Sequence, residues 1–149
     1  MATTMDPKEM KQRLENVRTV ANILDFSQPA EIGYQAGFTD EYFEAMHELG
    51  IRHYNNGQYN EAIVIFKQLC VLQSLTAKYY KALGAALQAS GDYATAVKVY
   101  AQGVDLAMMD AEFNFYAGQC FFLMRNYKGA AEALDVAKHY CEKYPDQWK

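Results

Sequence analysis

The sequence predicts an all-α fold in which three helix–turn–helix units stack behind an N-terminal helical segment. The main observation is a spacing of 34 residues that recurs for glycine, tyrosine and alanine, because a fixed period of this length marks a repeat architecture. Of the 149 residues, 51% are apolar, which suffices for one domain with its own core. The repeated positions are Gly50, Gly84 and Gly118; Tyr59, Tyr93 and Tyr127; Ala62, Ala96 and Ala130; and the large apolar Phe66, Tyr100 and Leu134.

Residues 1–38 precede the repeats and contain one predicted amphipathic helix. Asp6 and Pro7 are typical of a helix start, and Gln28-Pro29 ends the segment. The apolar residues recur at steps of four and three, so they share one face of the helix. Two interpretations of this stripe remain open: it packs on the chain's own repeats, or it pairs with a second copy as a dimerisation region. The stripe is Met10, Leu14, Val17, Ala21 and Leu24.

The first repeat begins where Thr39-Asp40 can cap a helix. We expect its first helix at about 42–55 and its second at about 59–72, joined by a turn at Asn56-Gly57 with the glycine in a left-handed conformation. Gly50 lies within the first helix, where glycine costs about 1 kcal/mol relative to alanine. Such a glycine indicates that another helix approaches closely, with Ala62 at the crossing and Phe66 beyond it.

The second and third repeats follow the same plan. In the second repeat Gly91 takes the place of the turn glycine, and in the third Arg125-Asn126 stands there instead. We therefore expect the third turn to be strained or differently shaped. The remaining repeated residues (Leu49, Gly50, Tyr59, Ala62, Phe66 and their equivalents) are predicted to form the core.

These motifs resemble the tetratricopeptide repeat, whose signature is W-x2-L-G-x2-Y followed by A-x3-F. The second unit matches best, with Tyr80-x2-Leu83-Gly84-x2-Leu87 and then Ala96-x3-Tyr100. The resemblance implies units at about 43–76, 77–110 and 111–144 within a repeat domain over 39–149, and a right-handed superhelix with a concave groove. Positions 2, 5, 9 and 12 of each first helix would face that groove. They are Glu44, His47, Ile51 and Tyr54; Lys78, Lys81, Ala85 and Gln88; and Glu112, Phe115, Gln119 and Phe122.

Several classes of function are disfavoured by the sequence. The net charge is −4 and the basic residues are scattered, which argues against nucleic-acid binding. No catalytic motif is present, and neither the three histidines nor the three cysteines have metal-ligand spacing, so we expect no enzyme, no cofactor and no metal. The cysteines are expected to be reduced and mostly buried. No secretory signal or membrane-spanning run is visible, which makes a cytoplasmic protein the default expectation.

Three stretches resemble a narrower family, the class II chaperones of bacterial type III secretion. They are LCVLQ at 69–73, YYKALGAALQASGDYATAVKVYAQG at 79–103 and FYAGQCFFLM at 115–124. This resemblance implies a cytoplasmic protein that binds an extended segment of hydrophobic translocator proteins in its groove and keeps them soluble and unassembled before export. It also implies a homodimer formed through the N-terminal region.

The sequence departs from that family at some positions. His47 stands where the groove often has an aromatic residue, and no G-x-T-L turn is found near the N-terminus. Many members carry a further helix after the third unit, so we expect exposed apolar surface at that end. Two alternatives stay open: a scaffold that bridges folded proteins through its convex or end surfaces, and a regulator of a transcription factor.

Overall fold

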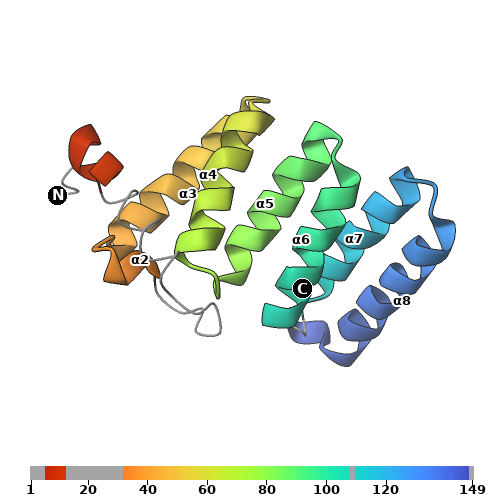
Figure 1. Cartoon of the computed structure of the whole chain (residues 1–149). Coiled ribbons are helices and arrows are strands. Elements are labelled where there is room, and N and C mark those ends of the chain that lie inside the picture. The colour runs from red at the N-terminus through yellow and green to blue at the C-terminus, as the bar shows by residue number, and fades with distance from the viewer. Residues whose placement is uncertain (1–5, 13–31, 108–109, 148–149) are drawn as a thin grey trace.

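The computed structural model describes residues 6–12, 32–107 and 110–147. Residues 7–12 are helical, and the rest of the described chain forms the row of helices in Figure 1. In chain order these are α2 (Ile32–Gln35), α3 (Asp40–Asn55), α4 (Tyr59–Leu72), α5 (Ala77–Ser90), α6 (Tyr93–Leu106), α7 (Ala111–Leu123), α8 (Tyr127–Lys143) and the short 3₁₀ helix η1 (Pro145–Gln147).

The long helices pack as successive antiparallel pairs, and the predicted all-α fold is confirmed for the described residues. Each helix from α3 to α8 contacts the next one along the chain, so each pair packs on its neighbour. Side-chain caps define several helix starts, because an oxygen near the first turn accepts from an otherwise unpaired backbone N–H. Thr39 caps α3 in this way, Asp92 caps α6, Asp110 caps α7 and Asn126 caps α8.

The mid-helix glycines allow the helices of a pair to approach closely. A Cβ placed on Gly84 would lie 2.2 Å from Cε1 of Tyr100, which is fully buried. Gly50 stands in the same relation to Phe66, at 2.4 Å from Cε1 of its ring. Each glycine therefore leaves the space that the large residue of the partner helix fills, as the sequence predicted.

The turns inside the pairs share a left-handed residue. Its φ is 75° at Gly57, 91° at Gly91 and 61° at Arg125. Of the two expectations for the third turn, the second is wrong: the left-handed conformation is kept. An L-residue with a Cβ occupies it, at a cost of about 1 kcal/mol.

Part of the N-terminal segment packs on the first helix pair. Sequence reasoning missed α2, because four helical residues leave no readable period. Gly33 of α2 faces the ring of Phe43, and both Ile32 and Phe38 are buried. Met10 lies near α3, where its sulfur accepts from the Tyr42 hydroxyl at 4.0 Å. The other members of the apolar stripe, Leu14, Val17, Ala21 and Leu24, lie outside the described residues.

The expected core needs correction at the two ends of the row. Leu49 is 36% exposed, although its equivalents Leu83 and Ala117 are buried. At the other end Tyr127 is 59% exposed and Leu134 is 39% exposed. Repeated apolar positions are buried by the neighbouring pair, and within the described chain no long helix precedes α3 or follows α8. The repeat pattern alone assigned these residues as though every unit had two neighbours.

Candidate functional site

The predicted groove positions lie on α3, α5 and α7, the first helices of the three pairs. Ten of the twelve line two hollows, and the other two, Glu44 and Glu112, form ion pairs with groove lysines. The first hollow includes His47, Ile51, Tyr54, Lys78, Lys81 and Ala85. The second includes Gln88, Phe115, Gln119 and Phe122.

The first hollow encloses about 410 Å³ between α3 and α5. His47 is half-buried in its wall, with its ring centroid 5.4 Å from that of Tyr79 and 6.0 Å from that of Phe66. Burial lowers the pKa of His47, and the nearby Lys78 lowers it further. At neutral pH the imidazole is therefore uncharged, and it forms part of an otherwise apolar wall.

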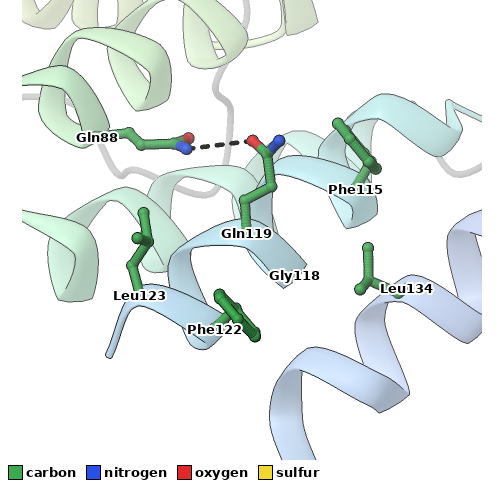
Figure 2. Close-up of a pocket in the computed structure, with 7 residues that line it drawn as sticks. All are labelled: Gln88, Phe115, Gly118, Gln119, Phe122, Leu123 and Leu134. Atoms are coloured by element: carbon green, nitrogen blue, oxygen red, sulfur yellow. Dashed lines mark hydrogen bonds between the residues drawn. The ribbon is translucent and has the colours of Figure 1, made fainter. Parts of the chain in front are cut away.

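The second hollow encloses about 360 Å³ and lies between α7 and α8 (Figure 2). Phe115 is 45% exposed and Phe122 is 59% exposed. Leu134 of α8 faces them across the hollow, over the backbone of Gly118. Large apolar side chains gathered in an open hollow are typical of a surface that binds another molecule.

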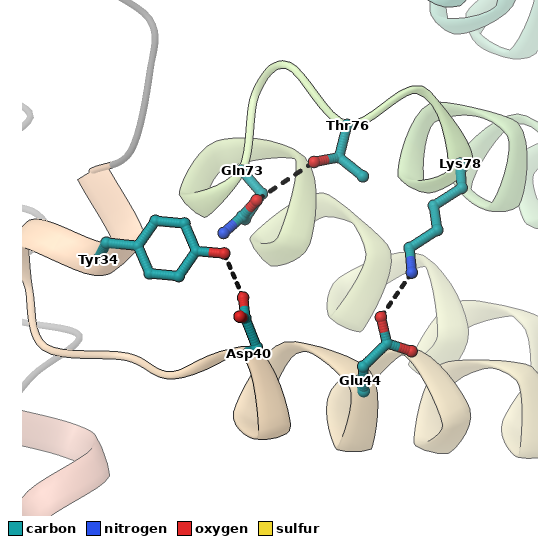
Figure 3. A network of polar contacts seen from close by, with 6 residues as sticks. All are labelled: Tyr34, Asp40, Glu44, Gln73, Thr76 and Lys78. Atoms are coloured by element: carbon teal, nitrogen blue, oxygen red, sulfur yellow. Dashed lines mark hydrogen bonds and ion pairs between the residues drawn. The ribbon is translucent and has the colours of Figure 1, made fainter.

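The middle of the groove is less basic than the sequence indicated. Lys78 pairs with Glu44 at 2.6 Å (Figure 3), and a hydrogen bond from Lys78 lowers the pKa of that carboxyl. Lys81 pairs with Asp110 at 2.7 Å and with Glu112 at 2.9 Å. Burial opposes the charge on Lys81, but its hydrogen bonds to the two carboxylates outweigh that effect and raise its pKa. Both ammonium groups are thus held by carboxylates of the neighbouring pair.

The polar contacts beside α3 extend to its N-terminal end (Figure 3). The Tyr34 hydroxyl donates to Asp40, and Thr76 donates to the side-chain oxygen of Gln73 at 3.2 Å. These contacts join α2 to α3 and fix the loop between α4 and α5. They therefore help to hold Glu44 and Lys78 on facing helices at the edge of the groove.

Some lining residues were missed because only the first helices were assigned to the groove. Phe66 and Leu134 belong to second helices, where the repeat signature marks them as core. Tyr116 reaches the first hollow from α7, one pair further along the chain. The repeat signature could have found Leu134, since the last unit has no following helix to cover this position.

The cysteines are free, and two of them are unreactive by burial. Burial raises the pKa of Cys70 to about 12 and that of Cys120 to about 11, while Cys141 is exposed. Among the described residues no group of three His, Cys, Asp or Glu side chains could hold a metal ion. None of the helices in residues 6–12, 32–107 and 110–147 is long and apolar enough to cross a membrane.

Comparison with known proteins identifies the repeat. Residues 44–72 and 77–104 each match a model of the tetratricopeptide repeat. Over 108 residues the chain is 27% identical to the low calcium response locus protein H of Yersinia pseudotuberculosis, covering 72% of this chain and 64% of that protein. The chain therefore spans slightly less than two thirds of that curated relative.

Two solved structures narrow the identification. The type III secretion translocator chaperone SycD of Yersinia enterocolitica aligns with a TM-score of 0.75 at 25% identity, over 80% of this chain and 89% of SycD. PcrH of Pseudomonas aeruginosa, solved with the chaperone binding region of PopB, aligns with a TM-score of 0.71 at 28% identity, over 75% of this chain and 90% of PcrH. The chain belongs to the class II chaperones of type III secretion. Within this chaperone family, the aligned share includes most of the described helices.

Proposed function

We propose that this chain binds an extended segment of hydrophobic translocator proteins in its concave groove and keeps them soluble and unassembled before export. The observation that carries the proposal is the pair of open apolar hollows along α3, α5 and α7. The solved relatives support it: PcrH holds the chaperone binding region of PopB, and SycD holds a peptide of the translocator YopD.

The proposed mechanism is binding without chemistry, in the bacterial cytoplasm. Large side chains of an extended segment would enter the two hollows and remove both surfaces from water. Burying one large apolar side chain contributes about 1.5–3 kcal/mol, so two anchors suffice for a stable complex. The twelve groove residues are proposed as the binding site, with Tyr54 in the first hollow and Phe115 in the second as the main contacts.

A peptide-binding assay tests this proposal. Peptides tiled across the translocators of the same bacterium are titrated against the chain, and the tightest is kept as the probe. Tyr54→Ala with Phe115→Ala should weaken it roughly tenfold or more, because each substitution removes an apolar wall. Val64→Ala with Val71→Ala is the matched control, since these valines are 56% and 54% exposed on α4 and line neither hollow.

The same assay separates the alternatives. A scaffold that bridges folded proteins would use convex or end surfaces, so the groove pair would be nearly silent and the control pair would weaken association. A regulator of a transcription factor could use the same groove. Purifying the tagged chain from its host and identifying the bound protein distinguishes a secreted translocator from a transcription factor.

We also propose that the chain forms a homodimer through the stripe Met10, Leu14, Val17, Ala21 and Leu24. The apolar spacing supports this proposal, and SycD has been crystallised in an alternative dimer. Leu14→Glu with Leu24→Glu should convert a dimer into a monomer by light scattering, because it places charge within the seam. Gln12→Glu with Asn22→Glu adds the same charge to the polar face and should leave the mass unchanged. An unchanged mass for the leucine pair would contradict the proposal.

A further inference from the structure

A row of three hydrogen-bonded side chains runs from the core to the groove at the second hollow. The hydroxyl of Tyr100, a fully buried residue, donates to Oε1 of Gln88 at 3.0 Å. Nε2 of Gln88 then donates to Oε1 of Gln119 at 3.2 Å (Figure 2). Both glutamines line the second hollow.

The direction of this row is fixed at its buried end. A phenol has one hydrogen to donate, and burial raises the pKa of Tyr100 so that it stays protonated. Gln88 must therefore turn its oxygen toward Tyr100 and its nitrogen toward Gln119. The oxygen of Gln119 accepts that bond, and its nitrogen points away from Gln88, toward the side of Phe115 (Figure 2). This nitrogen makes no hydrogen bond to any residue that the structure describes.

The row occurs at only one of the three equivalent sets of positions. The equivalents of Tyr100 are Phe66 and Leu134, which carry no hydroxyl. At the other positions the first unit has Tyr54 and Ile51 in place of the two glutamines. The close contact of Tyr100 with Gly84 involves only the ring, so packing does not explain the hydroxyl.

We propose that Gln119 is a specificity-determining residue whose amide nitrogen binds a main-chain carbonyl oxygen of the ligand. Tyr100 is a positioning residue that acts through Gln88. The inference rests on the proposed function and adds a chemical reason for selecting an extended segment. An extended peptide leaves its carbonyl oxygens free, whereas an α-helix uses them internally. A ligand side chain in the second hollow would bring its neighbouring carbonyl to the Gln119 nitrogen.

Substitutions at the ends of the row test the proposal by fluorescence anisotropy with the tightest tiled translocator peptide. Gln119→Glu keeps an oxygen for Gln88 but replaces the donor with a carboxylate oxygen, so affinity should fall roughly tenfold. Tyr100→Phe keeps the ring and removes only the hydroxyl, so affinity should fall roughly threefold as the amides lose their fixed orientation. Gln102→Glu, at an exposed position of α6, controls for added charge.

Ester-substituted peptides identify the carbonyl itself. Replacing one backbone amide of the probe by an ester weakens that carbonyl as an acceptor, and one position should lower affinity for the wild-type chain. The loss at that position should vanish in Gln119→Met, which has no donor, and shrink in Tyr100→Phe, as a double-mutant cycle measures. A merely structural role for the row would leave the ester effect unchanged.

The outcomes distinguish the two proposals. If the wild-type chain binds a translocator peptide and Gln119→Glu binds it equally well, the role of Gln119 is wrong and the proposed function stands. Should Gln119→Glu fail to fold by circular dichroism, the ester cycle with Gln119→Met decides the matter. If the wild-type chain binds no translocator peptide, the proposed function fails and this inference fails with it.

Discussion

At the scale of single residues, His47 decides the character of the first hollow. The ring lies beside Tyr79 and Phe66 and is kept uncharged by burial and by Lys78. Glu44 and Glu48 act in the opposite direction, because a nearby negative charge favours protonation. The hollow is therefore apolar at neutral pH and gains a positive charge when His47 is protonated.

This titration predicts that both stability and peptide binding weaken in mild acid. Because the folded-state pKa of His47 is lowered, the unfolded chain binds its proton first as the pH falls from about 6.5. The free energy of unfolding should then decrease until the pH passes below the lowered pKa. Urea unfolding at a series of pH values checks this. His47→Phe should reduce the slope in this window, and the exposed His139→Gln is the control; equal slopes for wild type and His47→Phe would contradict it.

At the scale of elements, the turns inside the helix pairs show how one position is used three times. Gly57 and Gly91 take up the left-handed conformation, and nothing lies within 4 Å of a Cβ built on either of them. Arg125 holds the same conformation with a full side chain. The difference between these turns is therefore one of backbone energy rather than of packing.

Arg125→Gly should stabilise the chain by about 1 kcal/mol, because glycine adopts a positive φ without the steric cost. The reciprocal change Gly91→Ala should destabilise it by about the same amount at the equivalent position. Urea unfolding of the two variants measures both effects. A loss of stability in Arg125→Gly would mean that the arginine side chain contributes more than its backbone costs.

At the scale of the whole molecule, ion pairs connect neighbouring helix pairs across the groove. Lys78 of the second pair reaches Glu44 of the first, and Lys81 reaches Asp110 and Glu112 at the start of the third. The side chains of Lys78 and Glu44 are 46% and 61% exposed, so their pair contributes little. Those of Lys81 and Asp110 are 30% and 22% exposed, so this pair is less screened by solvent.

Asp110 has two separable roles, because it also caps α7 by accepting from the backbone N–H of Glu112 at 2.9 Å. Asp110→Asn keeps a cap and removes the charge, so it should cost at most about 1 kcal/mol and less at high salt. Asp110→Ala removes both roles and should cost about 1 kcal/mol more. Unfolding at low salt and at about 1 M salt tests the difference. Equal losses for the two variants would assign no role to the cap.

Much of the fold could be predicted because each repeat repeats its own evidence. The bounds of α4 agree with the sequence, since Tyr59 and the turn before it recur at a fixed period. What could not be predicted depends on contacts between units. The pairing of Lys78 with Glu44 and the entry of Tyr116 into the first hollow follow from the rotation of one pair against the next. The exposure of Leu134 follows from its place at the end of the row.

The close contact of Gly84 with Tyr100 has a consequence for how this chain can evolve. A side chain added at position 84 would meet the ring at 2.2 Å, and a smaller residue at position 100 would leave a void beside the glycine. Either change alone is opposed, while both together exchange volume between two facing helices. Selection therefore acts on the two positions jointly, and related chains should vary them as a pair.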